Sequence, residues 1–277
     1  FTSANTETNG RLLVGGDASL TNYGVATDGN VPSDRFALYV GGTLTATNVG
    51  VGSGRGYAGG ASGAVSFNPP AVGPLQVGGA PLAGDVAAER ARLTTLSATL
   101  GALAATPGTT VTNAFGTWTF AGTGAGLNVF NVAAGDFDGA CTVDVNIPVG
   151  ATALINVAGT SAQTTPCGIF INGQGANGNA TTAMAGRVLW NYHQATTLTF
   201  RGSVIGSVLA PNATFTMPFA QLVGDFVARG GSGNTEFYSR PFVGDLPPTA
   251  VVPEPGALAL VAAGVAGVGV VSRRRAR

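Results

Sequence analysis

Short runs of apolar residues mixed with threonine, and separated by glycines, extend over the first 248 residues. Valine, leucine, phenylalanine and threonine favour strands, and glycine marks the turns between them. The pattern predicts many short strands, with examples at 11–14, 37–40, 117–120, 152–157 and 197–200.

Two internal repeats indicate how these strands stack. The segment 13–17 (LVGGD) recurs as 39–43 (YVGGT), and 205–210 (IGSVLA) recurs 18 residues later as 223–228 (VGDFVA). A spacing near 18 residues suits one turn of a β-solenoid, in which apolar side chains of successive coils stack and glycines allow the bends. We expect a mainly β fold, a β-solenoid of the parallel β-helix type. A β-sandwich is the alternative.

Residues 85–105 depart from the strand pattern. An apolar stripe at helical spacing is formed by Val86, Leu93, Leu96, Leu100 and Leu103. Asp85 suits a helix N-terminus, while Pro107 and Gly108 end the run. The segment predicts one long helix packed flat against the β core, with a short dimerising coiled coil as the alternative.

From Pro248 the chain changes character. A Pro253-Glu254-Pro255 element precedes the uncharged segment 256–271, and the chain closes on the basic cluster Arg273, Arg274, Arg275 and Arg277. Sixteen helical residues rise about 24 Å. Snorkelling arginines and local thinning can match this length to a membrane, with the arginine end cytoplasmic. We expect a C-terminal hydrophobic helix that is anchored in the inner membrane before processing.

The expected organisation has three parts. Residues 1–247 form a β-rich ectodomain, 248–255 a proline-rich linker, and 256–277 the transmembrane helix with its arginine-rich tail. The chain begins at Phe1 without a basic or apolar leader, so we expect that an export signal has been removed.

The amino-acid composition argues against several classes of function. Charged residues make up 9% of the chain, all 13 basic residues are arginines, and the formal net charge is zero. This charge is too low for a nucleic-acid binder that relies on a basic surface. One histidine and two cysteines do not make a metal cluster, and no cofactor is expected. In an exported protein, Cys141 and Cys167 can form a disulfide, with two buried thiols as the alternative.

Few residues suggest catalysis. His193 is the single histidine, no G-x-S-x-G motif accompanies it, and a hydrogen-bonded histidine at a strand end is the expected role. Trp190 and Tyr192 are candidates for stacking on a sugar ring, or are core aromatics. The acids Asp136, Asp138 and Asp144 raise the alternatives of glycoside hydrolysis and Ca²⁺ binding, against a default of solvated turns.

Threonine pairs recur at Thr43/Thr45, Thr117/Thr119, Thr197/Thr199 and Thr214/Thr216. On a flat solenoid face, aligned threonines would suit ice binding. The pairs do not follow a fixed period, and threonine is also a common strand residue, which both argue against such a face.

Two family resemblances emerge from these segments. The stretches NTETNGRLLVGGDASLTNYGV, RVLWNYHQATTLTF, GSVIGSVLAPNATFTM and FYSRPFVGDLP resemble the choice-of-anchor A domain of bacterial surface proteins. The tail resembles the PEP-CTERM sorting signal of Gram-negative bacteria. That resemblance implies recognition of Pro253, Glu254 and Pro255 by an exosortase-type transpeptidase.

Taken together, the sequence predicts an exported, non-enzymatic surface or matrix protein of adhesin-like character, with extracellular polysaccharide as a partner. A polysaccharide-active enzyme on a β-solenoid is one alternative, and an ice-binding protein is the second.

Overall fold

The computed structural model describes residues 1–68, 71–79, 82–137, 141–164, 167–175 and 183–248. Residues Phe1–Asp245 form one compact unit. The predicted C-terminal helix, the Pro-Glu-Pro element and the arginine cluster lie outside the described residues. None of the helices in the described ranges is long and apolar enough to cross a membrane.

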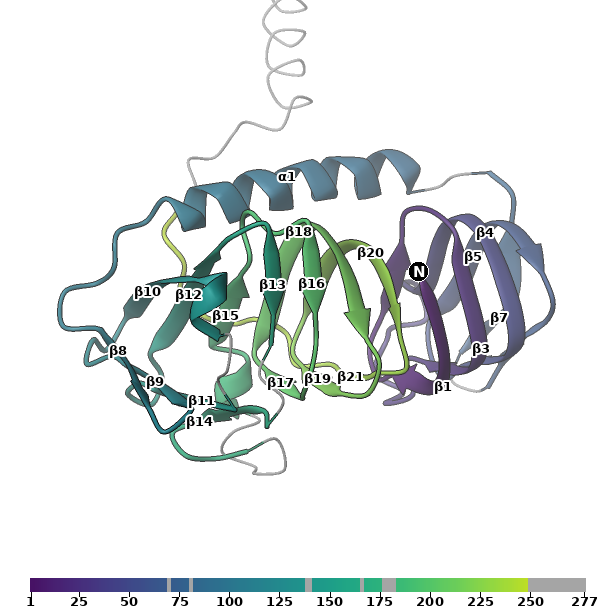
Figure 1. Ribbon diagram of the computed structural model, residues 1–277. Helices are drawn as coiled ribbons and strands as arrows, with labels where there is room; N and C mark the ends of the chain where they lie inside the picture. Colours follow the sequence, from purple (N-terminus) through teal and green to yellow (C-terminus); the bar gives the residue numbers. More distant parts are fainter. Residues whose placement is uncertain (69–70, 80–81, 138–140, 165–166, 176–182, 249–277) are drawn as a thin grey trace, which may run out of the picture. The chain divides into compact units, whose positions relative to one another are not determined.

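The compact unit is a stack of three-sided coils (Figure 1). In one coil, β17 (Val204–Ile205) forms one side and β18 (Ser207–Met217) bends to form the other two. The next coil repeats this with β19 (Gln221–Val223) and β20 (Phe226–Gly233), followed by β21 (Glu236–Tyr238). Face C is the side formed by β17 and β19, face A the side formed by the first halves of β18 and β20, and face B the side formed by their second halves.

Parallel pairing confirms the β-solenoid and shows that the β-sandwich alternative is wrong. Ile205 pairs with Val223 and Val208 with Phe226, so the 18-residue repeat corresponds to one coil. Leu13 pairs with Tyr39 in the same way, which places the other repeat on neighbouring strands. Gly206 and Gly224 sit at the bend between faces C and A with φ values of 105° and 154°. A Cβ on Gly224 would lie 2.5 Å from the Gly206 carbonyl oxygen, so this bend requires glycine.

The remaining strands follow the same three faces. Face A also contains β2 (Leu12–Val14), β7 (Val72–Val77), β10 (Leu127–Ala133), β12 (Thr152–Ala158) and β15 (Val188–Asn191). Strands on face B, some of which bend onto a neighbouring face, are β1 (Thr2–Thr8), β3 (Ala18–Val25), β4 (Phe36–Val51), β5 (Arg55–Ser62), β13 (Ser161–Gln163) and β16 (Thr197–Thr199). A short strand β6 (Val65–Phe67) pairs with β4.

A second sheet of four strands lies along one side of the stack, below β10, β12 and β15 in Figure 1. It consists of β8 (Thr110–Ala114), β9 (Thr117–Ala121), β11 (Thr142–Asn146) and β14 (Ile169–Ile171), and a 3₁₀ turn η1 (Ala134–Phe137) follows β10. Antiparallel pairing of β8 with β9 ends this sheet. The Thr106 amide donates a hydrogen bond to the Val129 carbonyl oxygen, and the Thr106 hydroxyl accepts one from the Val129 amide. These bonds cover the edge of β10 and protect the end of the solenoid from pairing with another chain.

The chain does not run through the stack in order. Strand β1 pairs with β20 and β21 on one side and with β3 on the other, so the first strand lies beside the last ones (Figure 1). The coils of β1–β7 extend away from this junction, and α1 (Ala83–Gly101) carries the chain back past it. Its 19 residues rise about 28 Å, or roughly six strand spacings of about 4.8 Å.

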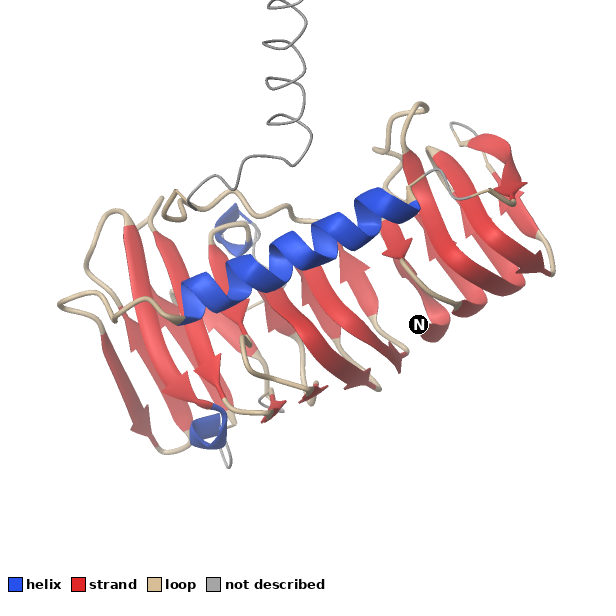
Figure 2. Cartoon of the chain, turned by 90° about the horizontal axis from the view of Figure 1, so that it is seen from above, coloured by secondary structure: helices blue, strands red, loops and turns tan. Residues whose placement is uncertain are grey.

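Helix α1 confirms the predicted helix and lies across the strands of face A (Figure 2). It begins at Ala83 and ends at Gly101, so Leu103 of the expected stripe falls outside it. Asp85 lies in the first turn, while the residue before the helix, Leu82, makes no side-chain cap. Leu100 is buried, and the other stripe residues within the helix are half-buried against strands of the same chain.

Three asparagines on adjacent strands of face A dock the end of this helix. The register aligns Asn131, Asn156 and Asn191 on β10, β12 and β15. Their amide nitrogens donate to the carbonyl oxygens of Leu103, Leu100 and Ser97, at 2.9, 2.8 and 2.9 Å respectively. The asparagine ladder therefore ties the last turns of α1, and the residues directly after it, to face A.

Candidate functional site

Face B carries a continuous column of outward hydroxyl groups. The pairing registers join neighbours one after another, from Thr199 to Thr216, Ser232, Thr2, Ser19, Thr45 and Ser62. These seven residues, here called the hydroxyl column, come from strands of both halves of the chain. At about 4.8 Å between parallel strands, the column is about 29 Å long.

The hydroxyl column is open to solvent. Ser19 is half-buried, and the other six residues are exposed. Within the described ranges the side chains of Thr199, Thr216, Ser232, Thr2 and Ser19 make no hydrogen bond to the protein, and Ser62 donates a long bond of 3.4 Å to Thr45. The column therefore presents free, uncharged donors and acceptors to whatever lies against it.

Small residues flank the column on both sides. On the side toward face A, Thr197 aligns with Thr214 and Gly230. On the side toward face C, Ala4 aligns with Thr21 and Thr47. Face B is thus broad and flat along these columns, because none of the aligned residues has a large side chain.

The structure corrects the expectation that unequal spacing prevents the threonines from aligning. Coils differ in length and the chain is not stacked in sequence order, so equal spacing is not needed for alignment. Three of the four predicted pairs lie on face B: Thr43/Thr45, Thr197/Thr199 and Thr214/Thr216. The pair Thr117/Thr119 lies on β9 in the second sheet.

Packing beneath face B keeps it in register. Leu198, Phe215, Leu20 and Leu44 alternate with the outward residues and are buried in the core. At the corner between faces B and C, Asn5, Asn22 and Asn48 adopt φ values of 56°, 48° and 53°. Asn22 donates to Asn5 at 2.8 Å and Asn48 donates to Asn22 at 3.0 Å, which stacks these corners on one another.

The same corner in the other half of the chain carries an exposed aromatic ring. Phe219 lies in the turn that leads from face B to face C, between β18 and β19, and is 80% exposed. By extension of the strand register, Arg201 and Asn234 align with Pro218, the residue before Phe219, in the coils on either side. Both are exposed, and neither side chain hydrogen-bonds within the described chain.

Trp190 and Tyr192 are not surface ligand contacts, contrary to one expectation. They are 1% and 4% exposed and belong to the core. The Trp190 ring nitrogen donates to the carbonyl oxygen of Ile205 at 2.9 Å. Burial raises the pKa of the Tyr192 hydroxyl.

The candidate catalytic acids have structural partners. Asp136 accepts a bond from the Ala133 amide at 2.8 Å, and Asp144 accepts bonds from the Gly173 amide and from Asn146. Asp138 lies outside the described residues. His193 packs close to Gly101 of α1, and its Nδ1 is buried and has no hydrogen-bond partner within the described chain.

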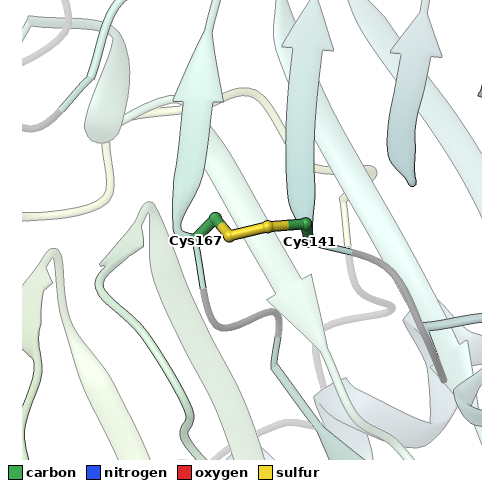
Figure 3. Close-up of a disulfide and its surroundings, with 2 residues drawn as sticks. All are labelled: Cys141 and Cys167. Atoms are coloured by element: carbon green, nitrogen blue, oxygen red, sulfur yellow. A yellow bond between two sulfur atoms is a disulfide. The ribbon is translucent and has the colours of Figure 1, made fainter. Parts of the chain in front are cut away.

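Other candidate chemistry is limited. Cys141 and Cys167 form a disulfide where β11 and β14 begin (Figure 3). Over the described ranges, no three histidine, cysteine or acidic side chains come together in a way that could hold a metal ion.

Fold and site together define a class: a parallel β-solenoid with a long, uncharged face that carries a column of hydroxyl groups. The chain belongs to the family described as "Putative Ice-binding-like adhesive domain", whose family model matches residues 1–239. A PEP-CTERM protein-sorting motif matches residues 251–275. The protein is therefore exported, carries the recognition signal for exosortase processing at its C-terminus, and bears an adhesive surface domain.

A comparison with solved structures finds similarity to an ice-binding protein from an Antarctic biological consortium. That similarity covers 86% of this chain and 85% of the other, at 17% sequence identity and a TM-score of 0.35. No curated protein matches the chain.

Proposed function

We propose that this protein is a non-enzymatic adhesin of the cell surface or extracellular matrix, and that face B is its adhesion surface for neutral polysaccharide. The hydroxyl column carries this proposal. A row of free hydroxyls at one strand spacing can hydrogen-bond repeatedly to an extended, hydroxylated partner. No single contact needs to be strong, because many weak ones act together along about 29 Å.

The low net charge of the domain also favours a neutral polysaccharide as the partner. Residues 1–250 hold nine arginines and twelve acids, so the domain has no strong field of either sign to attract a polyelectrolyte. The engaged side chains of Asp136 and Asp144 favour adhesion over hydrolysis. The segments that resemble the choice-of-anchor A domain support the same role, as does a sorting tail followed by inner-membrane release.

Ice is the second candidate partner, and one observation favours it. Ice is also an ordered array of neutral oxygen atoms, and the in-register threonines present a regular array of hydroxyls to it. The two partners share their chemistry at the surface, so a single set of variants can be assayed against both.

The test uses the processed protein recovered from the producing bacterium. Thr216→Tyr places a bulky ring at the second position of the hydroxyl column, between Thr199 and Ser232, and Thr112→Tyr is the matched control on the exposed strand β8 of the second sheet. We expect Thr216→Tyr to weaken co-sedimentation with the bacterium's own exopolysaccharide at least tenfold, and Thr112→Tyr to leave it unchanged.

Ice recrystallisation and thermal hysteresis form the second arm. Activity on ice alone, lost in Thr216→Tyr, would replace polysaccharide with ice as the partner. Release of soluble sugar by the wild-type protein would overturn the non-enzymatic assignment. Equal binding by both variants would overturn the assignment of face B.

A further inference from the structure

We infer that face B holds a single neutral glycan chain laid along the solenoid axis, about one sugar per strand, and that Phe219 stacks on one of its rings. This inference rests on the proposed polysaccharide adhesion and adds the direction of the chain and a specificity-determining residue.

The direction follows from the spacing of the hydroxyl column. Its members repeat at about 4.8 Å along the axis. An extended, equatorially linked glycan advances by a similar distance for each sugar, since each unit contributes one ring and one bridging oxygen. A glycan parallel to the axis therefore meets one protein hydroxyl per sugar. A glycan laid along the strands would cross the column only once.

The width of face B suits one chain. The flanking positions hold glycine, alanine or threonine, as at Gly230, Ala4 and Thr214, so a flat sugar ring can lie over the column without a steric barrier. Glycines on the side toward face A leave additional room, because Gly230 has open space where a Cβ would stand.

Phe219 offers an apolar stacking surface, which the hydroxyl groups of the column do not provide. Its ring is 80% exposed, although burial of a phenylalanine side chain is favourable. The turn that holds it begins two residues after Thr216, so the ring lies at the rim of face B. An aromatic face packs well against the C–H groups of a sugar ring, and this contact is unavailable on ice.

Polar neighbours complete the rim. Arg201 and Asn234 have free donors at the adjoining corner positions, and Asn234 also has a free acceptor. A pyranose stacked on Phe219 would bring its ring hydroxyls toward these groups. The absence of a strongly basic field argues against a polyanionic glycan and for a neutral one.

The test compares two exposed phenylalanines. Phe219→Ser removes the ring at the rim of face B. Phe115→Ser removes a fully exposed ring from the β8–β9 hairpin, in the second sheet. The probes are neutral β-1,4-linked glucose oligosaccharides of two to six units, titrated calorimetrically into the processed protein.

We expect affinity to rise with each added sugar up to six units, because each unit reaches one more strand. Phe219→Ser should weaken binding of the six-unit probe at least fivefold, with Phe115→Ser unchanged. Both variants should keep the wild-type unfolding temperature, since neither ring is packed.

Each contrary result has a distinct meaning. Affinity that stops rising after two units would overturn the axial direction, and wild-type binding by Phe219→Ser would overturn its stacking role. In either case, loss of binding in Thr216→Tyr would leave the adhesion proposal standing. No binding of any neutral glycan by the wild-type protein would overturn both.

Discussion

The asparagine ladder under α1 permits a quantitative prediction. Asn156 is the middle member and is 2% exposed. Its amide nitrogen donates to the Leu100 carbonyl oxygen at 2.8 Å and to Asn131 at 3.0 Å, while its oxygen accepts from Asn191 at 2.8 Å. Asn156→Ala therefore removes three hydrogen bonds at once.

The expected cost follows from these bonds. A net value near 1 kcal/mol for each bond gives a loss of about 3 kcal/mol in the free energy of unfolding. For a domain of this size, that corresponds to a drop of roughly 6–12 °C in Tm. The partners left behind have other bonds, because Asn191 still donates to Ser97 and Leu100 still accepts from the Leu103 amide.

Urea and thermal unfolding followed by circular dichroism would measure the change. Asn113→Ala on the exposed strand β8 is the control and should shift stability by less than about 0.5 kcal/mol. A loss below about 1 kcal/mol for Asn156→Ala would show that the apolar stripe alone docks the helix. That outcome would refute the role assigned to the ladder.

Four further predictions follow from other parts of the chain. Replacing Cys141 and Cys167 with serine should cost about 3.5 kcal/mol of unfolding free energy from loop closure, and in the wild-type protein alkylation should add two labels only after reduction. Phe115→Asn should stabilise the β8–β9 hairpin by about 1 kcal/mol in urea unfolding, since φ at this position is 51° and asparagine tolerates it; a lower midpoint would contradict this. Burial raises the pKa of the Tyr23 hydroxyl to about 12, so the contribution of the protonated hydroxyl to the free energy of unfolding is complete below pH 10 and is lost as the pH rises through 12. If the free energy of unfolding of Tyr23→Phe falls over that window as much as in the wild-type protein, Tyr23 is not the source of the fall. Pro255→Ala should leave the full-length protein in the membrane fraction on immunoblots, and normal processing would remove this residue from the sorting signal.

Much of the fold was predictable because it depends on local residues. The 18-residue repeat reflects one coil, and its glycines are required where successive bends approach closely, as at Gly224. The apolar stripe predicted α1, although Gly101 beside the His193 ring ends it before Leu103. The role of Trp190 was not predictable, since the sequence pattern around an aromatic residue is the same whether the ring stacks on a ligand or fills the core.

The asparagine ladder was missed for a physical reason. Asn131, Asn156 and Asn191 are separated by unequal lengths of chain, and only strand pairing brings them side by side. A sequence signal did exist, because each asparagine lies within or at the end of an apolar strand, where an unpaired polar side chain would be costly.

By itself, the sequence determined the coil repeat, the long helix, the low charge and the sorting tail, because each depends on residues close together in the chain. Only the tertiary structure decided the hydroxyl column. Ser232 and Thr2 become neighbours because α1 carries the chain past β1 to the other end of the stack, and the later coils build back from there until β20 pairs with β1. The sequence separation of these two residues does not predict their pairing, since hydrogen bonds between strands that are far apart in the sequence set the register.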